Sequence, residues 1–242
     1  MRKIALVTGG TKGLGKAISV RLTGENYRVY ALSRNPEPSL EKVMLIKADV
    51  SDEKECETAV KAILKKELRL DLLVNNAGVN DEENILTTFG VNVFGPYFLI
   101  KHSLGALKKN RGRIINITSL NGLVPTPNSS VYSASKHAIE GLGMALSYEL
   151  EKQGVYVTNI APGAIYDSNT KPLTHKPLRE KFILLKILFP MLTREKVVEA
   201  VLSVVKSERP PKRLMLGLDA KVSYFISRMF PDLWNFALRK LY

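Results

Sequence analysis

The fold of this chain is decided by residues 4–24, which read IALVTGGTKGLGKAISVRLTG. The apolar run at its start is typical of a buried strand, and the stretch after the glycines has the apolar spacing of a helix. Glycines permit a tight turn between them and let backbone N–H groups approach a phosphate at the positive end of the helix. A purely structural turn is the alternative that remains open. We predict a dinucleotide phosphate site formed by Gly9, Thr11, Lys12, Gly13, Leu14 and Gly15.

The same alternation of strand and helix patterns continues along the chain. Short runs rich in Val, Ile and Leu indicate strands covered on both faces, as in a parallel sheet. We therefore predict one domain over residues 1–242, an α/β Rossmann-type doubly wound fold with a seven-stranded parallel sheet flanked by helices on both faces. Ligands bind such sheets at the carboxyl ends of the strands. The predicted strands are 4–8, 27–33, 43–47, 70–75, 113–118, 156–161 and 213–216.

Composition narrows the class of protein. The chain has one cysteine, Cys56, so an intramolecular disulfide and a thiolate metal cluster are excluded and a reducing cytoplasm is expected. The three histidines lack metal-ligand spacing, and we predict no metal site. The longest apolar stretch, 182–192, contains Lys186 and Pro190 and has about half of the ~20 residues that a membrane span needs. No transmembrane segment is expected.

The chain is strongly basic, with a formal net charge of +13. Such a charge attracts phosphates, acidic proteins or anionic lipid surfaces, and its sign does not choose among them. A solvated basic surface without a partner is equally open. We do not expect a nucleic-acid binder, because the sequence shows no recognition motif and no basic stripe interleaved with aromatic residues.

The end of the second predicted strand bears on the choice of cofactor. Enzymes that prefer NAD present an acidic residue here to the ribose 2′-hydroxyl, but this chain has Ser33 and Arg34. Arg34, together with Lys12 from the glycine turn, supplies positive charge for the 2′-phosphate of NADP, which guanidinium binds through paired donors. We predict NADP(H) as the cofactor; the alternative is that both residues are ordinary surface cations.

A candidate proton donor lies near the start of the predicted helix 130–153. Tyr132 and Lys136 are four residues apart, which places the phenol and the ammonium on one face of the helix. A nearby cation favours the phenolate and lowers the pKa of a tyrosine from about 10 toward working pH. Ser119 ends a predicted strand, where its hydroxyl could hold a substrate carbonyl oxygen. A tyrosine and a lysine four residues apart, taken alone, also occur by chance in many helices.

The sequence resembles the short-chain dehydrogenase/reductase family, whose motifs occur here in the same order along the chain. The resemblance covers roughly the first 165 residues and rests on Thr8-Gly9-x3-Gly13-x-Gly15, Asp49-Val50, Asn75-Asn76-Ala77-Gly78, Asn92, Ser119, Tyr132-x3-Lys136 and Pro162-Gly163. It implies that Tyr132 exchanges the proton, that Ser119 orients the carbonyl, and that Lys136 binds the nicotinamide ribose and lowers the tyrosine pKa. It also implies that Asn92 bends its helix and holds a water that connects Lys136 to solvent.

The resemblance further assigns cofactor contacts. It implies that Asp49 and Val50 contact the adenine. The backbone of Asn75, Asn76, Ala77 and Gly78 would lie beside the adenosine ribose, and Ile165, after Pro162 and Gly163, would contact the carboxamide.

Two features depart from the family. Only thirteen residues separate Gly78 from Asn92, which predicts a shortened helix and an open mouth of the site. After Ile165 the family commonly has a threonine two residues on that binds the carboxamide, whereas this chain has Tyr166-Asp167-Ser168, in which Ser168 could substitute.

Two apolar segments lie beyond the family motifs. Residues 168–192 correspond to the substrate lid, and their apolar character predicts a lipophilic carbonyl substrate such as an acyl, sphingoid, steroid or retinoid-like compound. Packing on the sheet or on a second subunit is the alternative. Residues 217–242 form an apolar and basic C-terminal extension, which could rest on a membrane surface or serve as a dimer contact or lid buttress. Pro231 breaks any single long helix there.

These observations predict an NADPH-dependent oxidoreductase that transfers a hydride between nicotinamide and a carbonyl or secondary alcohol. A 3-oxoacyl-thioester reductase that docks an acidic carrier protein is the alternative substrate class. A non-catalytic NADP(H)-binding regulator is the alternative of a different class, and it has no need of Ser119, Tyr132 and Lys136 together. We expect a homodimer or homotetramer.

Overall fold

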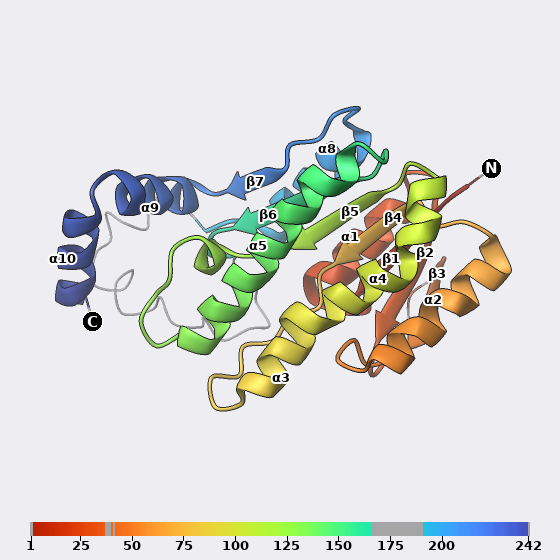
Figure 1. Cartoon of the computed structure of the whole chain (residues 1–242), viewed down its shortest axis with the longest axis horizontal. Coiled ribbons are helices and arrows are strands. Elements are labelled where there is room, and N and C mark those ends of the chain that lie inside the picture. Colours follow the sequence, from red (N-terminus) through yellow and green to blue (C-terminus); the bar gives the residue numbers. More distant parts are fainter. Residues whose placement is uncertain (1, 37–39, 41, 166–190, 242) are drawn as a thin grey trace.

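The computed structural model describes residues 2–36, 40, 42–165 and 191–241. Its centre is a seven-stranded sheet with the strand order β3-β2-β1-β4-β5-β6-β7, in which every pair of neighbours is parallel (Figure 1). This confirms the predicted fold class. The strands are β1 (Lys3–Thr8), β2 (Tyr27–Ser33), β3 (Val43–Lys47), β4 (Leu72–Asn75), β5 (Arg113–Ile117), β6 (Tyr156–Pro162) and β7 (Arg213–Leu216).

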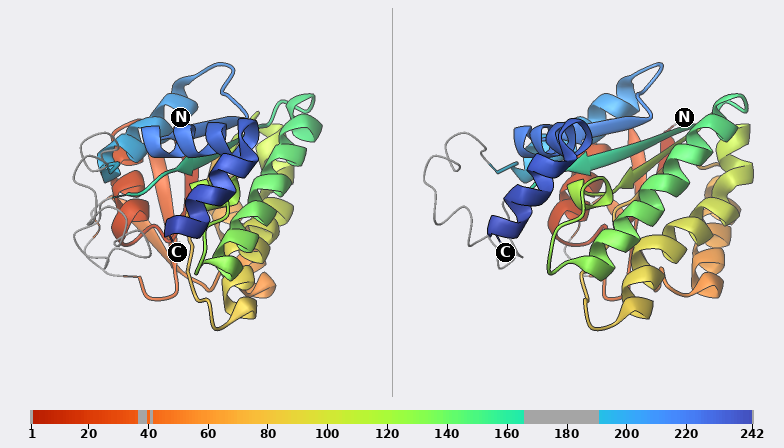
Figure 2. Two further views of the ribbon diagram at one scale, coloured as in Figure 1. Left: turned by 90° about the vertical axis from the view of Figure 1, so that its left-hand side faces the viewer. Right: turned by 60° about the vertical axis from the view of Figure 1, so that its left-hand side comes forward.

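Helices cover both faces of the sheet, as the buried strands require. On one face α1 (Gly13–Thr23) and α8 (Arg194–Lys206) pack through residues such as Ile18 and Val201. On the other face α2 (Glu53–Glu67), α4 (Gly95–Lys109) and α5 (Ser130–Glu151) pack on Leu6, Leu73 and Ile114 (Figure 2). The strand order reverses at β1, which pairs with both β2 and β4. A doubly wound sheet binds ligands at the carboxyl ends of the strands beside such a reversal.

A row of buried asparagines connects three strands to helix α5. Asn75 donates to Asn116 and Asn116 donates to Asn159, both at 2.9 Å, and Asn159 donates to the backbone oxygen of Glu140 at 2.8 Å. Helix α5 approaches this row closely, since a Cβ at Gly143 would lie 2.0 Å from Oδ1 of Asn159. Only glycine fits there. The row therefore sets how far α5, which carries Tyr132, stands from the sheet.

The connection between β4 and α4 contains the helix that was predicted to be shortened, and this helix has only five residues. It is α3 (Ile85–Phe89), which runs through a π-helical turn, η1 (Gly90–Phe94), directly into α4. A further 3₁₀ turn, η2 (Leu120–Gly122), follows β5. Both turns border the carboxyl edge of the sheet, where the candidate site lies.

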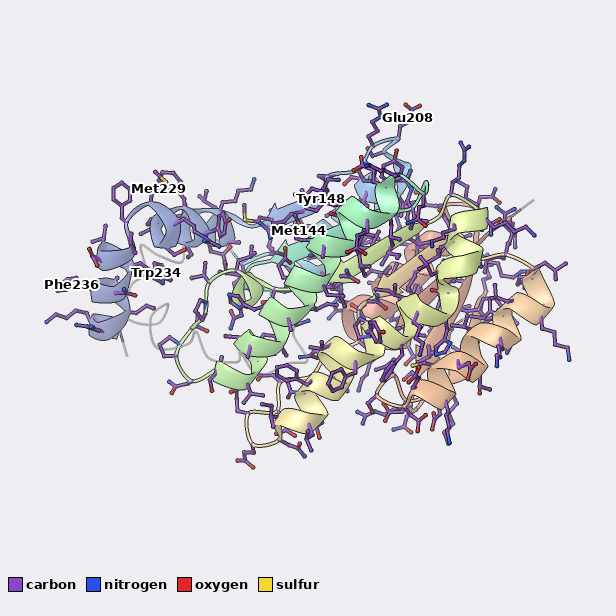
Figure 3. The ribbon with its side chains drawn as sticks, in the orientation of Figure 1. Met144, Tyr148, Glu208, Met229, Trp234 and Phe236 are labelled. Atoms are coloured by element: carbon purple, nitrogen blue, oxygen red, sulfur yellow. The ribbon has the colours of Figure 1, made fainter. Side chains whose placement is uncertain are left out.

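The C-terminal extension forms two helices that project beyond the end of the sheet (Figure 1). Helix α9 (Leu218–Met229) and helix α10 (Pro231–Leu241) are separated at Phe230, and Pro231 opens the second helix. Trp234 turns inward and packs with Tyr224 on a small cluster around Leu123 and Val124, whereas Phe236 lies on the outer side (Figure 3). Among the helices of the described segments, none has the length and apolar character needed to cross a bilayer.

Candidate active site

The glycine turn after β1 has the shape that a phosphate site needs. Gly9 and Gly13 have φ values of +60° and +54°, in the left-handed region that favours glycine. A Cβ at Gly15 would lie 2.2 Å from the backbone oxygen of Gly9, so the turn closes only with glycine there. Around Gly13 the space is open, and Lys12 provides no side-chain cap for α1. The first amides of α1 therefore lie beside open space, which fits a pyrophosphate.

The remaining predicted residues of this turn differ in exposure. Lys12 is exposed and Leu14 is half-buried, whereas Thr11 is buried. Gly10, which the sequence analysis did not single out, is also restricted to glycine, because a Cβ there would lie 2.8 Å from the backbone oxygen of Val7. Close packing of the turn on β1 explains this requirement.

The segment that follows β4 is tied to the end of β1 by Thr8. The Thr8 hydroxyl accepts hydrogen bonds from the backbone N–H groups of Asn76 and Ala77, both at 2.9 Å. The Asn76 side chain donates to the backbone oxygen of Thr8 at 2.9 Å. The side-chain NH₂ groups of Asn75 and Asn76 are thus both bonded within the protein, to Asn116 and to Thr8. Contacts of this segment with a nucleotide then fall to its backbone, as the resemblance implies.

The ends of β2 and β3 form the corner at which we predict the 2′-phosphate. Arg34 follows Ser33 and its side chain is 62 % exposed. Its Nη1 lies 3.9 Å from Oδ2 of Asp49, an exposed contact that contributes little to stability. The other carboxylate oxygen of Asp49 accepts from the backbone and hydroxyl of Ser51, while Val50 is buried. Arg34 is thus accessible to an anion.

Ser119 and Tyr132 meet in the structure although separate elements carry them. Ser119 begins the turn η2 after β5, and Tyr132 lies in the first turn of α5. Burial raises the pKa of Tyr132, and the nearby Ser119 hydroxyl acts in the opposite direction with a smaller effect. Without a further cation, Tyr132 is therefore a protonated phenol at neutral pH.

Lys136 lies one helical turn further, as the spacing predicted. Its Nζ lies 5.6 Å from the centre of the Tyr132 ring and donates to the backbone oxygen of Ile117 at 3.1 Å. The residue is only 4 % exposed, and burial lowers the pKa of its ammonium from 10.5 to about 8. The ammonium therefore stays mostly charged at pH 7, beside the phenol that it is predicted to influence.

Asn92 lies close to this lysine. It sits in the π-helical turn η1, and such a turn interrupts the regular helix where a bend was predicted. Its side chain bonds both backbone groups of Val79 and the hydroxyl of Ser135, each at 2.9 Å. A Cβ at Gly78 would lie 3.5 Å from both Oδ1 of Asn92 and Nζ of Lys136. The four predicted tetrad residues thus converge, while the water that connects Lys136 to solvent stays a prediction.

The segment after β6 is held by a residue that sequence reasoning missed. Asp219, in the first turn of α9, accepts from the backbone N–H of Ala164 at 3.0 Å. A Cβ at Gly163 would lie 2.4 Å from both carboxylate oxygens of Asp219, so glycine is needed where Pro162-Gly163 was predicted to contact the cofactor. Ile165 then pairs with Leu192. The only sequence signal for this contact was an acid shortly after the last strand.

A second residue that the sequence did not indicate, Glu82, bonds the first turn of α5.

Most of the predicted lid lies outside the described residues. Ser168 and the segment 168–190 lie outside the described residues, and of the predicted lid 168–192 only Met191 and Leu192 are described.

The fold and the site indicate an α/β protein that binds a nucleotide at the carboxyl edge of a parallel sheet. Comparison with known proteins supports this class. Residues 3–177 match the family described as short chain dehydrogenase. The chain is 30 % identical to a 3-ketodihydrosphingosine reductase of Bacteroides thetaiotaomicron, covering 99 % of this chain and 98 % of the relative. It is 32 % identical to a 3-oxoacyl-[acyl-carrier-protein] reductase of Synechocystis, covering 73 % and 79 %.

Solved structures of other proteins support the same family. A short chain dehydrogenase from Burkholderia cenocepacia in complex with NADP matches with a TM-score of 0.81 and 25 % identity, over 98 % of this chain and 97 % of that one. The chain therefore belongs to the short-chain dehydrogenase/reductase family. It is an oxidoreductase of the class that uses a nicotinamide cofactor.

Proposed function

We propose that this protein is an NADPH-dependent reductase of lipophilic ketones or aldehydes, which also catalyses the reverse oxidation of a secondary alcohol. The observation that carries the proposal is that the buried ammonium of Lys136 lies 5.6 Å from the centre of the Tyr132 ring, while the Ser119 hydroxyl acts to lower the pKa of that tyrosine. A non-catalytic NADP(H)-binding regulator needs a glycine turn but not this combination of three side chains. We therefore place Asn92, Ser119, Tyr132 and Lys136 in the catalytic machinery.

Ser119, Tyr132 and Lys136 each have a distinct task in the proposed reaction. NADPH, when bound along the glycine turn, supplies the hydride. Ser119 donates a hydrogen bond to the carbonyl oxygen and holds it next to Tyr132, which gives its proton to that oxygen as negative charge develops. The positive charge of Lys136 stabilises the phenolate that remains, which opposes the effect of burial on the tyrosine pKa. In oxidation Tyr132 takes the proton back.

The preference for NADP(H) depends on Arg34. We expect Arg34→Ala to weaken NADPH binding about 10- to 100-fold, the scale of lost hydrogen bonds to a charged group, and to leave NADH binding within about twofold. Fluorescence titration of both dinucleotides measures this without turnover. Arg209→Ala, at another exposed arginine, is the control. Equal weakening of both dinucleotides would contradict the assignment.

The proposed substrate class is supported by an apolar cluster that begins next to Ser119 in the sequence. Leu120 packs with Met215 and Trp234 on the cluster of Leu123 and Val124. A lipophilic chain beside the carbonyl fits this surface. The relative named 3-ketodihydrosphingosine reductase supports a long-chain ketone. A 3-oxoacyl thioester is the second candidate, because the relative from Synechocystis is named for that reaction and the basic surface suits an acidic carrier protein.

The test is absorbance at 340 nm with NADPH and a panel of long-chain ketones, steroid and retinoid carbonyls, aldehydes and 3-oxoacyl thioesters. We expect oxidation of NADPH with the long-chain ketones. Turnover confined to acyl-carrier thioesters would favour the second candidate. NADPH binding without turnover on any member of the panel would favour the regulator.

The proposal includes the place of the protein in the cell. We propose a cytoplasmic single-domain enzyme over 1–242 that forms a homodimer or homotetramer and whose C-terminal extension rests on an anionic membrane surface. Phe225 and Met229 on α9, Phe230 between the helices, and Leu233 and Phe236 on α10 are each more than half exposed. Lys221, Arg228, Arg239 and Lys240 are exposed on the same two helices. Apolar side chains flanked by cations are suited to the interface of an anionic bilayer.

Vesicle co-sedimentation tests this contact. With phosphatidylcholine vesicles that contain phosphatidylglycerol, we expect the double variant Phe225→Ser and Phe236→Ser to lower the partition coefficient at least about tenfold, because each phenyl ring contributes about 1.5–3 kcal/mol when buried. Leu86→Ser, at an apolar side chain that is 77 % exposed on α3, is the control and should sediment like the wild type. Equal sedimentation of all three proteins, or a changed oligomer mass in the double variant without vesicle binding, would reject the membrane contact.

A further inference from the structure

Helix α5 begins without the side-chain cap that helices usually have. Its first backbone N–H groups have no acceptor within the helix, and a serine at the N-cap position commonly accepts one of them. Ser129 occupies that position but makes no side-chain cap hydrogen bond. The first bond within the helix runs from Ser133 N to the backbone oxygen of Ser129 at 2.8 Å. The amides of Val131 and Tyr132 must therefore find another acceptor.

Glu82 supplies that acceptor from about fifty residues away. One carboxylate oxygen accepts from the backbone N–H of Val131 at 2.9 Å, and the other accepts from the backbone N–H of Tyr132 at 3.0 Å. The Ser130 hydroxyl lies 3.4 Å from the first of these oxygens. An anion at the positive end of a helix is favourable, and hydrogen bonds to a carboxylate are stronger than neutral ones. One side chain thus bonds the backbone of the candidate proton donor itself.

The segment that carries Glu82 is anchored on both sides. Before it, Val79 is bonded through both of its backbone groups to Asn92. After it, Oδ1 of Asp81 accepts from the backbone N–H groups of Glu83 and Asn84, at 3.2 and 3.1 Å. The buried Thr88 hydroxyl also bonds both backbone groups of Asp81, at 3.1 and 2.8 Å. The position of Glu82 is therefore set by the connection between β4 and α4.

We propose that Glu82 is a positioning residue, which holds the backbone of Tyr132 at a set distance from the segment 75–79 and thereby places the phenol relative to the nicotinamide and the substrate carbonyl. This inference rests on the proposed function. The connection after Gly78 carries Glu82 and so provides this contact. Misplacement of a reacting group by about 1 Å is enough to lower a rate about 100-fold.

The test compares Glu82→Ala and Glu82→Gln with Glu83→Ala, a control at the neighbouring exposed carboxylate. Glutamine keeps one oxygen acceptor but turns an NH₂ group toward the second amide. We expect kcat to fall about tenfold in the alanine variant and by less in the glutamine variant, with the Kd of NADPH within about twofold of the wild type and no change in the control. A merely structural cap would lower the melting temperature but leave kcat unchanged below it.

Amide hydrogen exchange provides a readout that needs no turnover. In the wild type we expect the N–H protons of residues 131 and 132 to be protected, and in Glu82→Ala we expect that protection to fall while residues later in α5 keep theirs. If protection falls but kcat is unchanged in folded variants, or if protection never depended on Glu82, the positioning role is wrong. If the alanine variant does not fold, the glutamine variant decides by the same two measurements. If the wild type turns over no member of the substrate panel, the proposed function is rejected. The exchange measurement would still show whether Glu82 holds the backbone of Tyr132.

Discussion

Tyr132→Phe is expected to lower the turnover of carbonyl reduction by about two orders of magnitude or more, the usual scale of general acid–base catalysis. Phenylalanine keeps the ring beside Lys136 but removes the hydroxyl that we propose to carry the proton. The developing alkoxide then has no proton donor in reach. Steady-state kinetics at 340 nm with the best ketone of the panel measures kcat, and fluorescence titration measures NADPH binding, which we expect to persist.

A matched control lies on the same helix. Tyr148 is 62 % exposed on α5, and its ring lies 4.6 Å from Nζ of Lys212, a contact that phenylalanine retains. Tyr148→Phe should therefore have wild-type kcat. Retention of at least a tenth of wild-type turnover by Tyr132→Phe would reject the role of Tyr132 as the proton donor.

Lys136→Met is expected to have the second large effect, on both turnover and stability. Turnover should fall about 100-fold, because the phenolate loses the charge that stabilises it. For stability, burial lowers the pKa of Lys136 from 10.5 to about 8. Between these two pH values the unfolded chain keeps a proton that the folded protein has released, so the free energy of unfolding rises with pH across this window. The contribution of Lys136 to that rise is on the order of 3 kcal/mol.

Urea unfolding of the protein without cofactor, at intervals from pH 7 to pH 10.5, measures this slope. Lys136→Met should be more stable relative to the wild type at pH 7 than at pH 10.5, since the buried charge is absent in the variant at every pH. Lys54→Met, at an exposed lysine of α2, should keep the wild-type slope. Parallel curves for wild type and Lys136→Met would show that the ammonium is not desolvated in the folded protein.

Local patterns of the chain were sufficient to predict the fold and the components of the site. The glycine turn at residues 9–15 was recognisable because positive φ values and close backbone approach admit only glycine. The pairing of Tyr132 with Lys136 followed from helical spacing, and the parallel sheet followed from the apolar strands. Asn92 fell in the π-helical turn where a bend was expected.

Other features had no local signal. The side chains of Asn75 and Asn76 bond residues on neighbouring strands, 41 and 68 positions away in the sequence. Asp219 meets the segment after β6 across 55 residues, and Glu82 meets Tyr132 across 50. A single carboxylate in a loop has no periodicity, so its partner could not be identified from its neighbours.

The sequence by itself therefore determined the strand and helix order, the glycine turn and the placement of Tyr132 and Lys136 on one helix face at the candidate site, because each depends on interactions within one or two turns of chain. Only the tertiary structure decided which polar side chains remain available at that site and which hold it together. That decision depends on hydrogen bonds between segments brought together by packing of the sheet and its helices, and such contacts exist only once the buried surfaces have formed.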